Sequence, residues 1–314
     1  MAKSSERPPE FFKSRRYLFH FHRISLAMKT TFFLPAFLAI PLASAAPFQP
    51  AHIPAEAQWF LHGDLTGLRK TETGNSLLKE IRSNENELLT DVEELFGFDL
   101  LSDLTDVTLF GNGKEDEAAI VLSGEIGRAH LEEVIVQADD YETSSHGTIT
   151  IHHWDDEGKP QHAAFHRDQT VIISEKRGLV SLALDVLSQK KPGLNPDFSL
   201  PSADPVIVAF ANIQKIDMPL EEGSRIIRKA NSILITMGEA EGLLVADMVV
   251  ETGTSKTATQ MMHVLEGLVS LGELADEKIE NLGLKHTGQT QGKSMTMSMS
   301  LPALNALALL SELK

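Results

Sequence analysis

DVTLFGNGKEDEAAIVLSGEIGRAHLEEVI, residues 106–135, reads as two apolar strands joined by an acidic turn that contains glycine, followed by a glycine and a helix. The same order recurs in SILITMGEAEGLLVADMVVETGTSKTATQM, residues 232–261. Because both stretches place strand, turn, strand and helix in the same succession, they predict that the chain contains a tandem duplication.

Hydrophobic periodicity extends this pattern in both directions. In the first half it predicts strands at 57–64, 107–110, 118–122, 147–154, 161–166 and 170–174, with helices at 68–95, 128–138 and 179–187. In the second half it predicts strands at 206–213, 233–237, 243–250 and 294–300, with helices at 222–230, 254–274 and 304–313. Each half then reduces to β-α-β-β-α-β.

The predicted fold class is α+β, with two tandem split-βαβ (ferredoxin-like) pseudo-repeats whose antiparallel sheets carry helices on one face. Residues 190–205 hold four prolines and show no strong periodicity, so they predict a break between the halves. We therefore expect a first lobe at 46–190, a linker at 191–205 and a second lobe at 206–314. Open sheets also pair edge to edge, so one continuous body is an equal alternative and a homo-oligomer through sheet edges is possible.

Residues 1–45 resemble a targeting segment. Lys29 follows Met28, an apolar run covers 32–42, and Ala43-Ser44-Ala45 forms a small-x-small cleavage site. The apolar run is about half of the roughly 20 residues that a membrane-spanning helix needs. We expect cleavage before Ala46, a periplasmic or secreted product and no stable membrane anchor.

Two interpretations remain for residues 1–27. Either Met28 is the true start and they are not translated, or the stretch SRRYLF at 14–19 belongs to a twin-arginine export signal, so Sec and twin-arginine export both stay open.

Composition excludes several classes of function. The chain has 28 basic and 44 acidic residues among 314, a formal charge of −16 that becomes −21 once residues 1–45 are removed. Such a surface repels nucleic acid, whose phosphates need clustered Lys and Arg, and favours cations or basic partners. The complete lack of cysteine excludes thiolate nucleophiles, cysteine-ligated metals and disulfides. Phosphate-binding glycine loops and nucleophile elbows are also missing.

Histidine is the best candidate for chemistry, because five of the ten histidines after residue 45 fall within 146–166, around a predicted turn. Depending on strand register, one of His152 and His153 meets His162 across the hairpin. With Asp155 or Asp156, such a pair offers two nitrogens and an oxygen to Zn²⁺ or Cu²⁺. The alternatives are a pH-sensing patch and, as we expect, an exposed polar hairpin whose rings splay over both faces and retain no metal.

Several short motifs carry a resemblance to a family: FGFD at 96–99, DVTLFG at 106–111, VLSG at 121–124, IHHW at 151–154, VIIS at 171–174 and ALDVL at 183–187. With these motifs the chain resembles uncharacterised exported bacterial proteins of planctomycete and verrucomicrobial genomes. No activity comes with that resemblance, and it supplies no site residues.

These observations together predict an exported protein that binds a protein or small-molecule partner, or acts as a scaffold, rather than catalysing a reaction. The alternative is a metal-assisted hydrolase, or a metal-binding protein, that uses the hairpin 146–166. A pocket lined with polar groups would favour the enzyme, whereas an apolar groove or an exposed sheet edge would favour the binding protein.

Overall fold

The computed structural model describes residues 48–156, 158–195, 200–201, 204–217, 226–275 and 281–306. The expected signal peptide and both of its alternative starts therefore lie outside the described residues, as does most of the helix expected at 304–313. So does the first part of the helix expected at 222–230.

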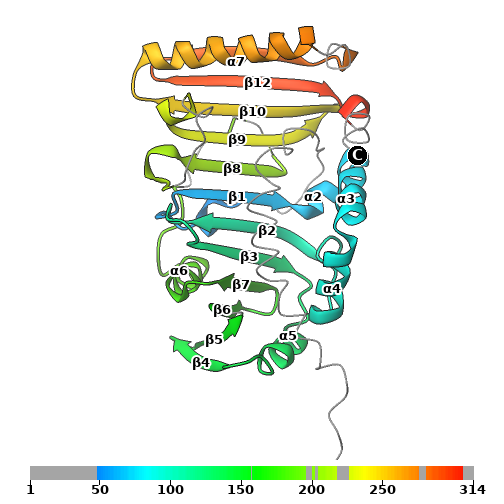
Figure 1. The fold of residues 1–314 in the computed structure, drawn as a ribbon, viewed down its shortest axis with the longest axis vertical. Helices are drawn as coiled ribbons and strands as arrows, with labels where there is room; N and C mark the ends of the chain where they lie inside the picture. Colours follow the sequence, from blue (N-terminus) through cyan, green and yellow to red (C-terminus); the bar gives the residue numbers. More distant parts are fainter. Residues whose placement is uncertain are drawn as a thin grey trace, which may run out of the picture.

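Twelve strands form a single sheet in the order β11-β12-β10-β9-β8-β1-β2-β3-β7-β6-β5-β4, and every neighbouring pair is antiparallel (Figure 1). The strands of the first half are β1 (Trp59–Asp64), β2 (Leu104–Gly111), β3 (Ala118–Gly124), β4 (Glu142–His146), β5 (Ile149–Asp156), β6 (Lys159–His166) and β7 (Thr170–Ser174). Those of the second half are β8 (Ile207–Asn212), β9 (Ala230–Ala240), β10 (Leu243–Thr252), β11 (Lys285–Gln291) and β12 (Ser294–Pro302).

The prediction of two ferredoxin-like repeats is wrong, although helices and strands both occur. A split βαβ unit needs a helical crossover between parallel strands. Here the helical connection that follows β1 returns to β2, which pairs with β1 in the antiparallel sense. The other edge of β1 pairs with β8, so the two halves join across the middle of one sheet.

The helices lie on both faces of this sheet, which corrects the expectation of one covered face. The α-helices are α2 (Leu65–Arg69), α3 (Glu72–Asn84), α4 (Asn86–Phe96), α5 (Arg128–Ile135), α6 (Arg177–Leu187) and α7 (Ser255–Ala275), with 3₁₀ turns η2 (Pro50–His52), η3 (Ile213–Lys215) and η5 (Ile227–Lys229). Figure 1 shows α7 along one end of the sheet, α3 and α4 beside the strand ends, and α5 and α6 near the other end.

Strand register assigns each helix to a face, because residues directly opposite each other on antiparallel strands share a side. On one face, which we call the α6 face, Phe60 lies opposite both Phe110 and Phe210. Phe60 and Phe110 pack with Leu184 of α6 in one core cluster.

The opposite face, the α7 face, has a large core toward each end, and two smaller clusters lie beside α2 and α3 and between β10 and β12. At one end, Val92 of α4 and Leu131 of α5 pack with Ile173. At the other end, Met261 and Met262 of α7 pack with Met295, as the alternation of methionines along 295–299 suggests.

Most expected elements form, with three instructive differences. The single helix expected over 68–95 is divided into α2, α3 and α4. Asp64 and Thr71 each accept a backbone N–H at the start of α2 and α3, whereas Glu85, which precedes α4, makes no such side-chain bond. Two edge strands, β4 and β11, were not expected. Their sequences, ETSSH and KHTGQTQ, are polar, so they lack the apolar alternation that identifies a strand.

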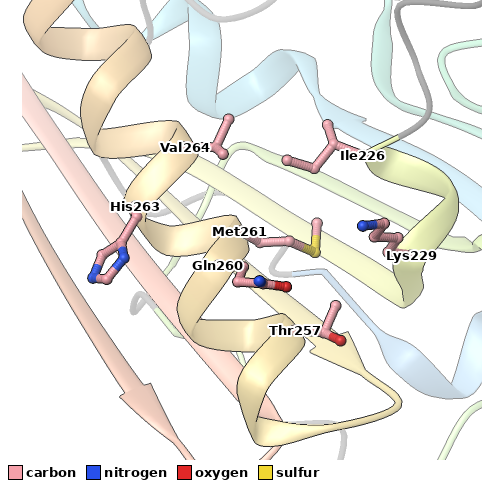
Figure 2. Close-up of a pocket in the computed structure, with 7 residues that line it drawn as sticks. All are labelled: Ile226, Lys229, Thr257, Gln260, Met261, His263 and Val264. Carbon is pink, nitrogen blue, oxygen red and sulfur yellow. The ribbon is translucent and has the colours of Figure 1, made fainter.

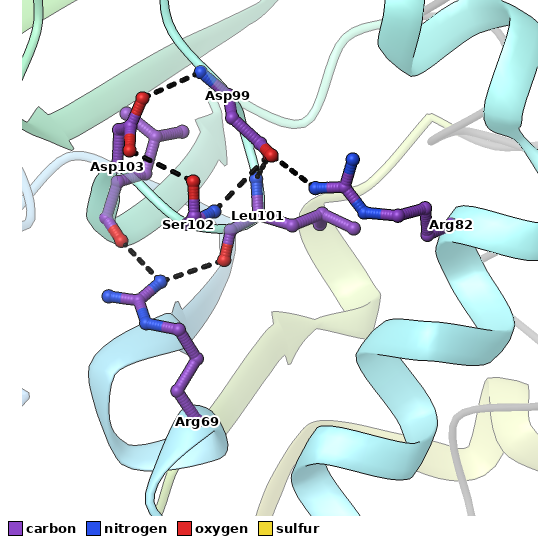
Figure 3. A network of polar contacts seen from close by, with 7 residues as sticks. Arg69, Arg82, Asp99, Leu101, Ser102 and Asp103 are labelled. Atoms are coloured by element: carbon purple, nitrogen blue, oxygen red, sulfur yellow. Dashed lines mark hydrogen bonds and ion pairs between the residues drawn. The ribbon is translucent and has the colours of Figure 1, made fainter.

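Two arginines fix the turn that leads into β2 (Figure 3). Arg69 Nη1 donates to the carbonyl oxygens of Leu101 and Leu104, both at 2.9 Å, and Arg82 forms an ion pair with Asp99. The other Asp99 carboxylate oxygen accepts from Leu101 N at 2.8 Å. This cluster of charges is accordingly a structural device that ties α2 and α3 to β2.

Candidate functional site

The structure brings together two of the five predicted metal ligands as a pair. His153 on β5 lies directly opposite His162 on β6, on the α6 face, and their ring centroids are 4.7 Å apart. His153 Nδ1 donates to the carbonyl oxygen of Gln161 at 3.2 Å. Burial lowers the pKa of His162, and the neighbouring His153 lowers it further. The expectation that the rings splay apart is therefore wrong for this pair.

His152, in contrast, points to the α7 face. It is buried, its Nδ1 lies 2.9 Å from the Tyr141 hydroxyl, and its ring meets Phe165 edge-on. Burial also lowers the pKa of His152. This side chain is part of the core that α4 and α5 cover, so it cannot join His162.

The two aspartates divide in the same way. Asp155 shares the α6 face with His153 by strand alternation, and one of its carboxylate oxygens accepts from Gly158 N at 2.5 Å in the turn. Asp156 is buried on the side of His152. Within the described part of the chain, no group of three His, Asp or Glu side chains is arranged to hold a metal ion. The metal site stays a prediction, and only His153, His162 and Asp155 share a face for it.

The feature that the sequence analysis missed is an apolar row on the α7 face that lies outside the core clusters of the described residues. One side chain from each of five adjacent strands forms this row: Ile120, Leu109, Leu61, Ala209 and Ile235, from β3, β2, β1, β8 and β9. All five are half-buried, and none belongs to a core cluster formed by the described residues. We call this row the floor. It connects the core under α5 to the core under α7, since Ile120 lies opposite Ile173 and Ile235 lies opposite Met248.

Trp59 extends the floor by one position along β1. Its indole is half-buried and lies over Gly111, where a Cβ would stand 2.3 Å from Trp59 Nε1. Glycine at position 111 is therefore what makes room for the ring. The other tryptophan of the chain, Trp154, is 2% exposed in the core under α4 and α5.

A wall of exposed apolar side chains stands beside the floor. Val264, Leu268 and Leu271 follow one another at helical spacing along one flank of α7, and their exposed fractions are 41%, 57% and 61%. The sheet-facing side of the same helix carries Met262, which is 4% exposed. We call the floor and this wall together the open apolar face.

A shallow pocket of about 330 Å³ shows which way the wall faces (Figure 2). Val264 and Met261 line it together with Ile226 and Lys229, which lie at η5 just before β9. The flank that carries Val264 is thus turned toward β9 and the floor, whereas Met262 and Glu266 on the other side approach Gly288 of β11.

The chemistry of the open apolar face is that of a binding surface. Its floor and wall contain no ionisable side chain, so they offer no acid, base or metal ligand. The sequence does hold one signal for it: Ile233-Leu234-Ile235 and Val121-Leu122 are apolar on both alternating positions, as expected for strands buried on both faces. Nothing in that pattern distinguishes a face covered by the chain's own helices from one left open.

Comparison with known proteins gives little. No family model matches the chain, and no curated protein matches it. Among solved structures, crystal form III of TP0453 is 12% identical with a TM-score of 0.49, covering 86% of this chain and 99% of that one. Crystal form I of TP0453 is 13% identical with a TM-score of 0.46, covering 85% and 98%. At these values, neither structure nor function is carried over to this chain.

The structure also answers one question about membranes. Among the helices that the described residues form, none is long and apolar enough to cross a bilayer.

Proposed function

We propose that this chain is an exported, non-enzymatic binding protein whose binding site is the open apolar face. The observation that carries the proposal is the floor: five neighbouring strands each present an apolar side chain that no described core cluster takes up. The signal-like segment at 1–45 supports export, and the acidic composition keeps such a protein dispersed until a partner covers the site.

Energetics favour a macromolecular occupant. Covering a Leu or Ile side chain completely contributes about 1.5–3 kcal/mol, and specific protein interfaces bury roughly 800 Å² on each partner. A floor and a wall of half-buried and exposed apolar side chains match the apolar centre of such an interface. The pocket beside the wall is shallow and does not enclose a ligand, so it does not resemble a site for a small polar substrate.

The histidine hairpin supports the enzyme alternative less well. His152 and Asp156 are directed away from His153 and His162, so the set of two nitrogens and an oxygen expected from the sequence is divided between the two faces of the sheet. Binding at the open apolar face therefore remains the function that the geometry supports best.

Trp59 provides the experiment, since it lies at the floor while Trp154 is buried elsewhere. The probe is an 18-residue amphipathic Leu/Lys peptide, compared with a scrambled peptide of the same composition. We expect the amphipathic peptide to shift the tryptophan emission to shorter wavelength, because covering the floor removes water from the indole. Trp59→Phe should abolish the shift.

Matched variants distinguish binding at the open apolar face from non-specific hydrophobic binding. Leu268→Ser combined with Leu271→Ser should weaken peptide binding about tenfold or more, as loss of two apolar contacts predicts. Leu304→Ser, at a position that is 69% exposed outside the wall, should leave binding unchanged. Equal binding of the scrambled peptide, or equal loss in all variants, would show that the open apolar face is not a binding site.

A further inference from the structure

We propose that the occupant of the open apolar face is the α7 helix of a second copy of this chain, in a two-fold dimer. This inference rests on the proposed function, because it names the partner for the same surface. In this dimer the wall of each copy packs on the floor of the other, so the interface consists of two equivalent wall–floor contacts.

Two apolar surfaces lie outside the core clusters that the described residues form. Four of the exposed large apolar side chains among the described residues lie on α7: Val264, Leu268, Leu271 and Leu274, the last 86% exposed. The floor is the second surface. Among the described residues of one copy, the wall is exposed and the floor is half-buried. A two-fold pairing covers both at once, as an interface that joins the same patch on both partners must.

Shape is the second step. On the α7 face, α7 stands at one end of the sheet and α5 near the other, and the floor lies between them (Figure 1). Five strands at about 4.8 Å spacing make the floor roughly 19 Å across, and helices pack about 10 Å apart. Another helix therefore fits beside α7 on the floor. The α7 helix has 21 residues and is about 31 Å long, enough to run the length of β3, β2, β1 and β8, which have six to eight residues each.

The orientation of the wall agrees with this arrangement. On an α-helix at about 100° per residue, the core-facing positions 258, 261, 262 and 265 define the side turned to the sheet. Residues 264, 268 and 271 lie roughly 70–130° around the helix from the centre of that side, and position 274 lies nearly opposite it. The exposed apolar stripe thus runs from the wall, beside the floor, to Leu274, which is directed away from the sheet. A second copy whose sheet faces this one would contact the outward part of the stripe.

The free sheet edges are the other surface by which copies could pair. Both edge strands, β4 and β11, present polar sequences and are mostly exposed. Pairing through them would leave the floor and wall uncovered, so we assign the dimer contact to the open apolar face and treat edge pairing as an outcome that the experiment detects.

The net charge of the protein predicts how dimer formation depends on salt. Each copy carries a formal charge of −16, or −21 once residues 1–45 are removed, so two copies repel each other at long range, and salt screens that repulsion. An apolar contact between acidic copies should therefore tighten as salt rises, whereas a contact built on ion pairs would loosen.

The experiment measures mass by sedimentation equilibrium on the protein expressed as the full chain and recovered after export, at 50 and 500 mM NaCl. We expect a dimer at micromolar concentration whose dissociation constant falls at the higher salt. A wall variant, Leu268→Lys with Leu271→Lys, and a floor variant, Ala209→Glu, should each be monomeric. Leu304→Lys, outside the wall, should remain a dimer.

Mixing the variants gives the decisive result. A heterodimer of wall variant and floor variant keeps one native contact and sets the introduced lysines against the introduced glutamate, so mixing should restore the dimer. Because the wall positions are exposed, that variant should fold normally, and circular dichroism checks this for both variants. Recovery on mixing would support the proposal even if one variant were less stable.

Two outcomes would overturn the inference. One is a monomer at all concentrations up to about 100 μM, and the other is a dimer that persists in both variants, as edge pairing through β4 or β11 would give. Neither outcome touches the proposed function, which depends on the response of Trp59 to the peptide probe. A monomer that still binds the probe keeps the function and removes the self-association.

Discussion

Single residues on this sheet take their roles from the face to which strand alternation assigns them. Alternation correctly places His152 and His153 on opposite sides, but it leaves open which of them meets His162. The structure selects His153, because β5 and β6 pair with Asp156 opposite Lys159 at the turn. A one-residue change in that register would reverse the pair, so the sequence predicted the alternatives and only the turn geometry chose between them.

Buried histidines make stability depend on pH. His62 on β1 is 6% exposed, its Nδ1 lies 2.8 Å from Thr108 Oγ1, and Phe48 packs on its ring at 5.3 Å. Burial lowers the pKa of His62, and it outweighs Asp106, which raises the pKa; His52 lowers it further. Its Nε2 has no hydrogen-bond partner among the described residues, so nothing there stabilises a second ring proton.

We expect the free energy of unfolding to decrease as pH falls through and below about 6.5. A histidine with a lowered folded pKa binds its proton more readily in the unfolded chain, and each such proton contributes a slope of at most about 1.4 kcal/mol per pH unit. His62→Gln should flatten this dependence between pH 7.5 and 5.5 in urea unfolding. His263→Gln, on the exposed side of α7, should keep the wild-type slope. Identical slopes for wild type and His62→Gln would remove His62 from the explanation.

At the scale of helices and strands, the sequence was informative wherever an apolar pattern was strong. The strand at 170–174 and the long helix near 254–274 form close to where periodicity predicts them, as β7 and α7. Periodicity failed at polar β4 and β11, which are strands because a neighbour supplies hydrogen bonds and not because they bury side chains. The floor was missed for a related reason: an apolar side chain looks the same in sequence whether it is covered or open.

The two sides of α7 should respond differently to truncation. Met262→Ala removes a side chain that is 4% exposed against the sheet, so we expect a loss of about 2–4 kcal/mol in the free energy of unfolding. Leu271→Ala, at 61% exposure, should cost less than about 0.5 kcal/mol in the monomer. Urea unfolding followed by circular dichroism, at a concentration well below any dimer formation, measures both. Equal losses would mean that α7 is not seated as described here.

The whole molecule shows what repeat-like patterns cannot determine. Both predicted hairpins exist, β2–β3 and β9–β10, and the helices that follow them, α5 and α7, pack on the same face. The pattern contains no information about which free edges meet. The pairing of β1 with β8 joins the two expected sheets into one. In this pair Phe60 lies opposite Phe210, and their rings stack with centroids 5.6 Å apart. Whether residues 46–190 and 206–314 also fold as separate units stays a prediction.

A test of whether the two halves unfold cooperatively needs a destabilising variant in one half and a probe in the other. Val250→Ala weakens the core under α7, in the second half, by removing a side chain that is 1% exposed, and should cost about 2 kcal/mol. Trp154 reports only on the first half, because it lies in the core under α4 and α5. If the sheet unfolds as one unit, the urea midpoint from tryptophan emission, measured in a Trp59→Phe background, should fall by as much as the midpoint from circular dichroism.

Val136→Ala, at an exposed position after α5, should move neither midpoint. A Trp154 midpoint that stays in place while circular dichroism shows two transitions would instead establish two independent folding units, joined by β1 and β8 only after each has formed.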